Sequence, residues 1–328
     1  MSNISKRNES LDSLKGIAIL LVMFGHVQVH NQMTDPFLYD MIKSLQMPLF
    51  FLISGYLCGA GRKVETLAEL GRRIGKRAVA YLLPFFSWLV LQHITNVPKA
   101  LKAVLFQLDY GLWFLMVLFL FTTLAYIAMW VQARVGAEWG FWLVWLLGCM
   151  AALLAYLGGV TFLSPSLQIT YLPYYTAAYF VGVHPKITRR ALPRWRRSSL
   201  AWIGGGIFIM MAAALDLVTV TGVDMLAVQT LASFFGCFWL IQIVIDWKLN
   251  PIKSRLAWLG QYTLEIYVVH YHFAAILNRS GAIYSFWTFS GLLYSLAAFA
   301  VMSVITASLI VVIRKIPVVR LLLFGKKK

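Results

Sequence analysis

The chain contains 328 residues, of which 60% are hydrophobic and only 12% are charged, and its mean hydropathy is +0.75. Soluble domains contain about 45–50% apolar and about 25% charged residues, so this composition excludes an ordinary soluble domain. The formal net charge of +17 does not indicate nucleic-acid binding, because the basic residues lie in short segments between apolar stretches and form no DNA- or RNA-binding motif. The three cysteines occur singly, with neither a disulfide framework nor metal-ligand spacing. These features predict a polytopic membrane protein.

Ten apolar stretches each approach the ~20 residues that a helix needs to cross a bilayer. They lie approximately at residues 14–32, 45–60, 78–97, 110–131, 140–160, 168–184, 200–219, 226–246, 256–278 and 290–313. We therefore expect an all-α fold with about ten transmembrane helices. The second stretch is short and glycine-bounded, which makes it a candidate for a tilted or interrupted helix. No repeat or appended soluble segment is apparent, so we expect residues 1–328 to form a single integral membrane domain.

Lysine and arginine are distributed unevenly between the segments that join these spans. With the N-terminus inside, the inner segments hold 25 of the 29 basic residues, and the outer segments hold only Lys43, Lys99, Lys102 and Arg279. Short cytoplasmic loops are enriched in lysine and arginine. The asymmetry therefore predicts that both termini face the cytoplasm, and it supports an even number of spans.

The first apolar stretch, residues 11–30, carries three ionisable side chains on one face of the predicted helix. Lys15 and His26 are 11 residues apart, which is ~16 Å along a helix and within ~20° of three full turns. His30 continues this face one turn further. Ionisable groups deep in a membrane are costly to bury and are therefore candidates for function. We expect this segment to be retained, because no convincing signal-peptidase site follows it.

Two other interpretations of this face remain open. Lys15 can extend its amine to the membrane surface while His26 bonds to a neighbouring helix, with no catalytic role. The i, i+4 spacing of His26 and His30 also suits zinc. No third ligand is apparent, however, since His270 and His272 point to two different faces of a helix.

Two further stretches predict no chemistry by themselves. Residues 46–56, Gln-Met-Pro-Leu-Phe-Phe-Leu-Ile-Ser-Gly-Tyr, place Pro48 near the start of a span and Ser54-Gly55 inside it. These residues would allow a helix break or close approach of two backbones, although helix packing through small residues is the plainer alternative. Residues 111–115, Gly-Leu-Trp-Phe-Leu, place a tryptophan at the outer start of a span, where tryptophan is common.

The run Gly-Arg-Arg-Ile-Gly-Lys-Arg at residues 71–77 places four cations at the inner end of a span. Such a cluster suits a phosphorylated ligand, for example a nucleotide-bearing acyl carrier. It equally satisfies the positive-inside rule or binds anionic lipid headgroups. From these residues alone, both interpretations stand.

The ninth predicted span carries three polar side chains, Glu265, Tyr267 and His270, within its hydrophobic region. One polar residue in a span is often structural, but three in one span are unusual. Glu265 and His270 are candidates for buried pairs with groups on other helices.

Taken in order, these stretches resemble acyltransferase family 3 of integral membrane acyltransferases. The matching pieces are Leu-Asp-x-Leu-Lys-Gly…Gly-His-Val, Pro-Leu-Phe-Phe-x-Ile-Ser-Gly-Tyr, the basic run before Leu-Leu-Pro, Leu-Trp-Phe-Leu and Ile-Tyr-x-x-His. The resemblance covers essentially the whole chain, in a short form without an extra soluble domain. It implies that His26 is the catalytic-site histidine and that Lys15 is the basic residue separated from it by ten positions.

Three positions depart from the family pattern. Lys15 stands where arginine is commoner, so the fork geometry of a guanidinium is absent. The family's Arg-x-x-Arg pair has only an approximate match in Arg73-x-x-Lys76, with Arg77 adjacent. Glu265 replaces the small or neutral residue expected there, and its role is open.

The resemblance implies transfer of an acyl group, most often acetyl, from cytoplasmic acyl-CoA to a hydroxyl of a cell-surface or lipid-linked glycan. No cofactor would be bound permanently, because acetyl-CoA or another acyl-CoA is the donor substrate. The cations Lys15, Arg73, Lys76 and Arg77 would hold the CoA phosphates.

His26 has two possible roles in that reaction. It would act as general base on the sugar hydroxyl, or it would carry the acyl group transiently as an acyl-imidazole. His270 and Tyr267 are candidates for orienting His26 or the acceptor. The sequence does not choose between the two routes.

The expected location is a bacterial cytoplasmic membrane, with membrane lipids as further partners and no nucleic acid. A polytopic transporter or flippase for a polysaccharide precursor is the remaining alternative, because it would also have ten spans with buried polar groups. That class predicts an internal repeat and paired broken helices, and the sequence shows neither.

Overall fold

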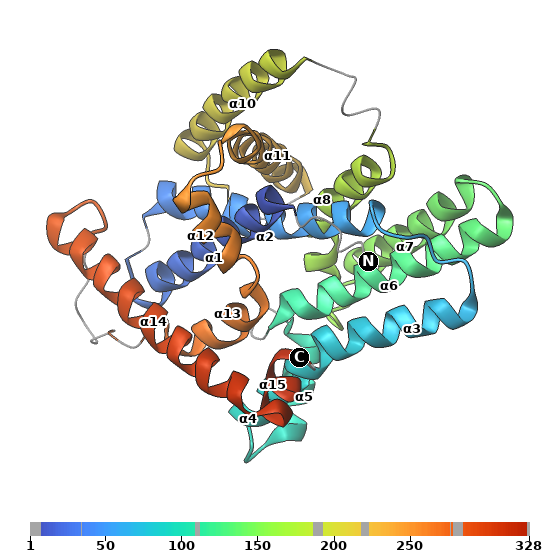
Figure 1. Ribbon diagram of the computed structural model, residues 1–328, viewed down its shortest axis with the longest axis horizontal. Helices are drawn as coiled ribbons and strands as arrows, with labels where there is room; N and C mark the ends of the chain where they lie inside the picture. The colour runs from blue at the N-terminus through green and yellow to red at the C-terminus, as the bar shows by residue number, and fades with distance from the viewer. Residues whose placement is uncertain are drawn as a thin grey trace, which may run out of the picture. The chain divides into compact units, whose positions relative to one another are not determined.

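The computed structural model describes residues 8–33, 35–108, 112–185, 193–217, 223–275, 277 and 285–326, with only the backbone at 223 and 224. Every regular element in these residues is a helix (Figure 1). The prediction of an all-α fold is confirmed. The physical reason is that a helix satisfies every backbone polar group within one segment, which an apolar span requires.

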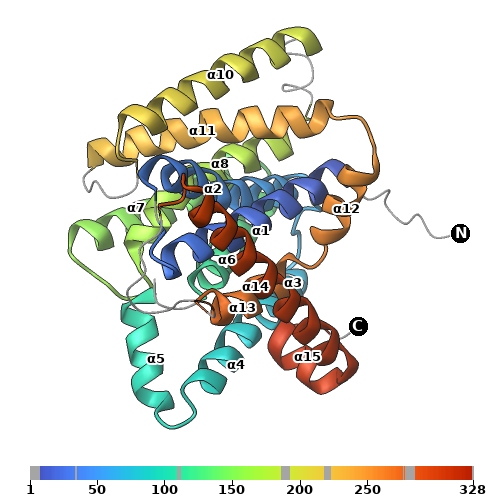
Figure 2. The same cartoon turned by 90° about the vertical axis from the view of Figure 1, so that its left-hand side faces the viewer.

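Helices joined by short connections make up most of the described chain (Figure 2). Their bounds are α1 Glu9–His30, α2 Pro36–Gly59, α3 Leu67–Arg77, the π-helical turn η1 Ala78–Leu82, α4 Leu83–Gln92, α5 Val97–Phe106, α6 Trp113–Val135, α7 Trp139–Leu157, α8 Pro165–Val183, α10 Arg194–Ala214, α11 Val223–Asp246, α12 Pro251–Leu259, α13 Thr263–His270, the 3-10 turn η3 Tyr271–Phe273, α14 Phe289–Lys315 and α15 Pro317–Phe324.

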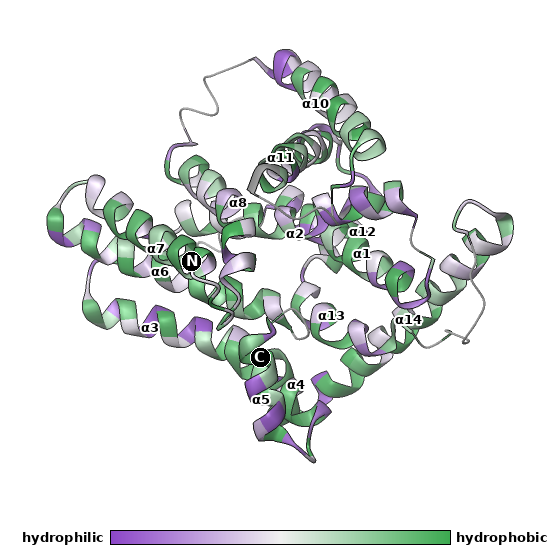
Figure 3. Cartoon of the chain, turned by 180° about the vertical axis from the view of Figure 1, so that it is seen from behind, coloured by the Kyte–Doolittle hydropathy of each residue, from purple (hydrophilic) through white to green (hydrophobic). Residues whose placement is uncertain are grey.

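Within the described residues, eight helices are long and apolar enough to cross a membrane: α1, α2, the continuous α3–α4 segment, α6, α7, α10, α11 and α14. They correspond to eight of the ten predicted spans, and apolar residues dominate their ribbons in Figure 3. The chain is therefore an integral, multi-pass membrane protein. The predicted span at 168–184 corresponds to α8, a helix of 19 residues whose tyrosines and polar residues make it less apolar than the eight.

The ninth predicted span, residues 256–278, is not one helix. α12 ends at Leu259, a turn follows at residues 260–262, and α13 runs from Thr263 to His270. The turn begins at Gly260, where an added Cβ would overlap the carbonyl oxygen of Asp12 in α1. Close packing against α1 therefore accompanies the break, which places His270 at the end of a short helix. Residues 276 and 278 of this predicted span lie outside the described part of the chain.

The second span also differs from its prediction. It was a candidate for interruption, but α2 is a continuous helix of 24 residues that begins at Pro36 and contains Pro48. The apolar stretch at 45–60 is thus the second part of a longer helix. The first part carries polar side chains such as Asp40 and Lys43, which is why hydropathy alone did not include it.

The chain forms two compact packing units. Unit 1 comprises residues 1–53 and 186–312, and unit 2 comprises residues 54–185 and 313–328. The division falls within α2 and within α14. Packing units of this kind are not by themselves separate domains, so the single membrane domain over residues 1–328 stays a prediction.

In unit 1, α1 packs closely against α12. A Cβ added at Gly16 would overlap the carbonyl oxygen of Leu256, so glycine is required for this approach. The Ser13 hydroxyl lies 3.0 Å from the carbonyl oxygen of Lys253, and the Lys253 amine donates to two carbonyl oxygens at the end of α11. The first turns of α1 are thereby held against the chain that leads into α13.

The far end of α1 is also fixed within unit 1. Gln28 donates a hydrogen bond of 3.0 Å to the Ser295 hydroxyl of α14, and Asn31 donates one of 2.8 Å to the carbonyl oxygen of Ala274. Both amides are buried. Because a buried polar group is costly to leave unpaired, these bonds favour one register of α1 against α13 and α14.

In unit 2, small residues at the end of α2 meet α8. A Cβ added at Gly55 or Gly59 would overlap the carbonyl oxygens of Tyr175 and Tyr179, respectively. The Ser54-Gly55 segment thus supports close backbone approach and not a helix break. Aromatic rings continue this packing between α7 and α8, where Phe141 stacks on Tyr179 with ring centroids 4.3 Å apart.

Candidate active site

α1 positions the three ionisable residues that the sequence singled out. Its 22 residues are continuously helical, and the Asn8 side chain accepts hydrogen bonds from the backbone N–H groups of Ser10 and Leu11 at its start. An asparagine in this position satisfies donors that have no partner within the helix. Because the helix is unbroken, Lys15 and His26 lie ~16 Å apart along its axis, on nearly the same face.

His26 lies among aromatic rings from two helical segments of unit 1. The ring of His270, at the end of α13, is perpendicular to it with a centroid separation of 5.1 Å. The ring of Tyr271 is 5.2 Å away, and His30 stacks on His26 at 5.8 Å with an interplanar angle of 16°. The structure thus brings His270, which is distant in the chain, against His26 and places it near the His26–His30 stack.

His270 is held in a defined orientation. Its Nδ1 lies 2.8 Å from the carbonyl oxygen of Ile266, and its side chain is 1% exposed. A carbonyl oxygen only accepts hydrogen bonds, so Nδ1 is the donor and Nε2 of the neutral ring is left as an acceptor. Nε2 is buried and has no hydrogen-bond partner among the described residues. The ring of His270, which contacts His26, therefore carries a buried hydrogen-bond acceptor, Nε2.

The other polar residues of α13 are also buried. Tyr267 is 9% exposed, and its ring centroid is 6.2 Å from that of His270. Glu265, in the first turn of α13, is fully buried. α13 is only eight residues long, and its last six are all buried, so its polar groups face protein and not lipid.

Lys15 makes an ion pair with Asp12, three residues earlier in α1, at 3.1 Å. The Asp12 side chain is 8% exposed and that of Lys15 is 25% exposed. The carboxylate therefore fixes the position of the lysine amine while leaving it accessible. Asp12 belongs to the first motif, and its i, i+3 spacing to Lys15 is the feature of the sequence from which this pair is predictable.

The basic residues at 71–77 belong to unit 2 and differ among themselves. Arg73 is bound within its own segment: it pairs with Glu69 at 2.6 Å and donates to the carbonyl oxygens of Arg62 and Lys63. Glu69 also accepts a second hydrogen bond from the Arg73 Nε. Lys76 is exposed. Arg73 therefore closes the loop before α3, and its donors are already in use.

Arg77 has a different environment. Its guanidinium donates to the hydroxyls of Tyr126 in α6 at 3.2 Å and of Tyr81 in η1 at 3.1 Å. Among the described residues, it makes no ion pair with a carboxylate within 4.0 Å. The π-helical turn begins one residue after Arg77, and Pro84 follows at the start of α4. The charge of this half-buried arginine is therefore not neutralised by a carboxylate among the described residues.

Across the described part of the chain, no group of three or more His, Cys, Asp or Glu side chains could hold a metal ion. His26 and His30 would need a third ligand to form the zinc site that their spacing allows. The rings in contact with them are the imidazole of His270 and the phenol of Tyr271.

A family model described as an acyltransferase domain matches residues 8–313. The chain belongs to acyltransferase family 3. The match covers both units and contains every candidate site residue. It confirms the resemblance that the ordered motifs indicated, and it concerns the family and not the role of any one residue.

Two curated proteins are similar in sequence to part of this chain. It is 29% identical over 182 residues to nodulation protein NolL of Sinorhizobium fredii, which covers 51% of this chain and 47% of the relative. It is 27% identical over 190 residues to nodulation protein NolL of Mesorhizobium japonicum, covering 53% and 48%. The chain thus spans about half the length of the curated relatives it matches. No solved structure matches it.

Several residues around the family's motifs were not anticipated from the sequence. Tyr81 lies four residues after Arg77, so helical spacing alone could have predicted their contact. Tyr126 and Tyr271 had no such signal, because their contacts depend on how separate helices pack. Gly16, next to Lys15 in the first motif, is explained by the approach of α12.

Proposed function

We propose that this acyltransferase family 3 protein transfers an acyl group, in the first instance acetyl, from cytoplasmic acyl-CoA to a hydroxyl of a cell-surface or lipid-linked glycan. The observation that carries the proposal is the contact of His26 with the buried ring of His270, in a chain whose family is that of acyltransferases. A histidine whose ring is oriented by a second group is the usual arrangement for a general base or nucleophile.

In the direct route, His26 accepts the proton of the sugar hydroxyl while that oxygen attacks the thioester carbonyl carbon. The carbon–sulfur bond then breaks, CoA leaves as the thiolate, and the imidazolium returns the proton to the sulfur. Nε2 of His270 is an acceptor, so it can hold the N–H of His26 and direct the other nitrogen of that ring toward the hydroxyl. His270 is in this scheme a positioning residue.

In the second route, a nitrogen of His26 attacks the thioester, forming an acyl-imidazole and releasing CoA as its thiol. The sugar oxygen then attacks the acyl carbon, the carbon–nitrogen bond breaks, and the hydroxyl proton passes to the ring nitrogen, which regenerates the neutral imidazole. This route separates donor and acceptor in time. It would allow an acyl group taken from one side of the membrane to reach an acceptor on the other.

The donor phosphates require cations that remain accessible and are not held in a carboxylate pair within a loop of the protein. Arg77 and the exposed Lys76 meet this requirement, and Lys15 supplies an accessible amine fixed by Asp12. Arg73 is bound to Glu69 and to two carbonyl oxygens, so we propose that its role is to hold the loop before α3 in place. CoA carries several phosphate charges, which guanidinium and ammonium groups bind well.

The proposed location is a bacterial cytoplasmic membrane, with both termini in the cytoplasm. The positive-inside distribution of Lys and Arg supports this orientation, and the relatives named above are bacterial proteins. The cations at residues 71–77 would then face the compartment that contains acyl-CoA. The acceptor glycan would be lipid-linked or on the cell surface.

The test uses purified full-length protein in nanodiscs, radiolabelled acetyl-CoA and a glycan acceptor, with wild type compared with His26→Ala. His93→Ala is the matched control, because His93 is an exposed histidine at the end of α4. Transfer by wild type and by His93→Ala, but not by His26→Ala, is the expected result. Label retained on wild-type protein without acceptor supports the acyl-imidazole route, and turnover without retained label supports the direct route.

Two results would overturn the proposal. The first is transfer by His26→Ala at the wild-type rate. The second is absence of donor binding and of turnover in well-folded wild-type protein, which would favour the transporter alternative. Circular dichroism and size-exclusion chromatography of each variant establish that it is folded.

A further inference from the structure

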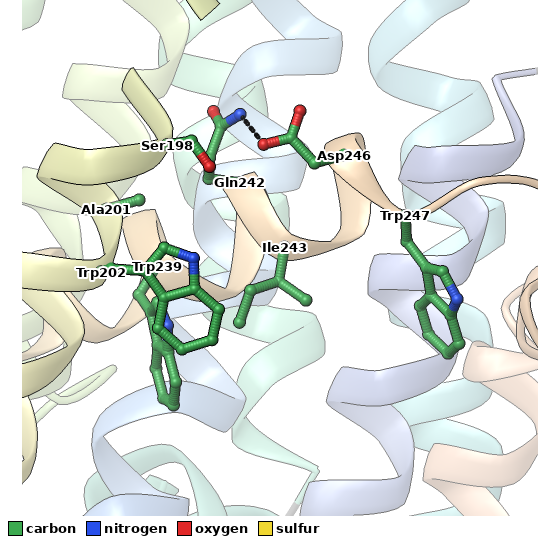
Figure 4. Close-up of a pocket in the computed structure, with 8 residues that line it drawn as sticks. All are labelled: Ser198, Ala201, Trp202, Trp239, Gln242, Ile243, Asp246 and Trp247. Atoms are coloured by element: carbon green, nitrogen blue, oxygen red, sulfur yellow. Dashed lines mark hydrogen bonds between the residues drawn. The ribbon is translucent and has the colours of Figure 1, made fainter. Parts of the chain in front are cut away.

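A cavity of ≈ 380 Å³ lies between α10 and α11 in unit 1, away from the histidine site. Figure 4 shows it with the rings of Trp202 and Trp239 beside one another and the polar groups of Gln242 and Asp246 above them. The two indole rings meet edge to face with centroids 5.7 Å apart. The cavity therefore has an aromatic wall and a polar end.

The cavity opens among exposed apolar side chains. Trp202 and Ile203 are each 60% exposed on α10, and Ile245 is 51% exposed on α11. In a multi-pass membrane protein, an exposed apolar surface on a spanning helix faces lipid hydrocarbon. A ligand that enters this cavity from its open side therefore comes from the bilayer.

At the polar end, the hydrogen-bond acceptors are already used. The Asp246 carboxylate accepts from the Gln242 amide at 2.7 Å, from the Arg194 Nε at 2.8 Å and from the Ser198 hydroxyl. The carboxylate charge is thus compensated within the protein. The repulsion between Asp246 and an anionic ligand is therefore reduced.

Two hydrogen-bond donors remain unused, one on a residue that lines the cavity and one on the residue of α10 that precedes the lining residue Ser198. The Nε groups of Arg197 and of Trp239 are buried, and neither has a hydrogen-bond partner in the described part of the chain. Arg197 lies four residues before Ala201, which lines the cavity, and so occupies the same face of α10. Buried polar groups in folded proteins are nearly always hydrogen-bonded. Two orphan donors therefore indicate a ligand that offers acceptor oxygens.

The first turn of α10, next to the cavity, is positively charged. The first turn of α10 carries Arg194, which pairs with Asp246, and two further cations, Arg196 and Arg197, and no acidic residue lies in that turn. Arg196 lies over the ring of Trp195, 5.0 Å from its centroid, as is common for arginine near a membrane surface. Cations and unpaired hydrogen-bond donors next to an apolar cavity match a molecule with an anionic head and a hydrocarbon tail.

We propose that this cavity binds an anionic phospholipid, with a phosphate oxygen at Arg197 and one acyl chain along Trp202 and Trp239. Basic pockets between spanning helices on the cytoplasmic side are typical sites for anionic headgroups. The positive-inside distribution assigns this end of α10 to the cytoplasmic leaflet, where such lipids are available. The occupant is a membrane phospholipid and not the acyl-transfer acceptor, because the site lies outside the histidine cluster.

The experiment is native mass spectrometry of delipidated full-length protein titrated with phosphatidylglycerol or with phosphatidylcholine of identical acyl chains. Wild type is expected to retain one phosphatidylglycerol with at least tenfold preference. Arg197→Gln is expected to weaken that binding roughly tenfold, since it removes a charged hydrogen bond. Trp239→Phe keeps an aromatic side chain but removes the N–H and reduces the ring from indole to phenyl, and it is expected to weaken binding severalfold.

Arg134→Gln is the matched control. Arg134 is an exposed arginine near the end of α6, so it carries the same charge as Arg197 but does not belong to the α10–α11 cavity. Equal binding of the two phospholipids, or equal loss in Arg134→Gln and Arg197→Gln, would overturn the proposal. Displacement of phosphatidylglycerol by a polyprenyl phosphate at equal concentration would also overturn it, in favour of a site for a lipid-linked sugar carrier.

Discussion

The histidine site in unit 1 and the arginine site in unit 2 are built in different ways. His26 and His270 contact each other because α1, α12 and α13 pack through glycine, and the site is made of aromatic rings around the buried His270. Arg77 lies at a π-helical turn and is held by two phenol hydroxyls near the end of a helix with an exposed face. The first site depends on exact packing, and the second depends on charge.

This difference predicts different kinds of failure. Proton transfer needs heavy atoms within about 2.6–3.2 Å, so small displacements at the histidine site should affect the rate of the chemical step. Phosphate binding by a guanidinium tolerates more movement and is weakened by salt. Substitutions in unit 1 should therefore lower kcat, whereas those at Arg77 should raise KM for acyl-CoA.

The largest effect is expected for His26→Ala. Loss of a general base typically lowers rates by about 10²–10⁴-fold, and loss of an acyl carrier would lower the rate at least as much. We expect kcat for acetyl transfer to fall within or below that range, with little change in KM for the donor. His30→Ala, one turn further along α1, should lower kcat by less than tenfold. Comparable losses in both variants would mean that the ring stack as a whole, and not His26, carries the chemistry.

Gly16→Ala tests whether the histidine site depends on backbone packing. The added Cβ would overlap the carbonyl oxygen of Leu256, so α1 and α12 must separate. Overpacking of this kind costs about 1–3 kcal/mol of stability, and kcat should fall with it. In Gly206→Ala nothing lies within 4 Å of the new Cβ, so stability should be unchanged or slightly higher. Thermal unfolding in detergent measures both, and equal midpoints for the two variants would contradict the packing argument.

Arg77→Gln and Arg73→Gln separate ligand binding from loop structure. We expect Arg77→Gln to raise KM for acetyl-CoA by about tenfold, because it removes a cation that no carboxylate in the described chain neutralises. Arg73→Gln should lower the unfolding temperature and leave KM within about twofold, since it loses contacts to Glu69, to the loop and to the ring of Tyr126. Steady-state kinetics at two salt concentrations decide the matter, and the opposite pattern would exchange the two roles.

The smallest effect is expected for Tyr267→Phe. The ring packing against His270 is kept, and only the hydroxyl is removed. We expect kcat to change by less than about threefold, because the orientation of His270 depends on its bond to the carbonyl oxygen of Ile266. A loss of one hundredfold or more would instead place the Tyr267 hydroxyl in the reaction, and kinetic comparison with His26→Ala would show which step it serves.

The features that depend on residues close together in the chain, namely the spans, the helical spacing and the motifs, were predictable from the sequence alone. Hydropathy located eight of the spans, because about 20 apolar residues in a row can only be accommodated as a helix in a membrane. The spacing of Lys15 and His26 along one helix followed from the same local periodicity, and the ordered motifs were sufficient for the family.

Tertiary structure decided the features that depend on residues far apart in the chain. The ninth span breaks at Gly260 where the backbone of α1 approaches, which hydropathy does not encode. Arg73 and Arg77 look alike in sequence, but Glu69 and loop carbonyls engage one while Tyr126 of another helix holds the other. His270 reaches His26 only because α13 packs beside α1. Contacts of this kind arise from the packing of whole helices, and no single stretch of sequence specifies them.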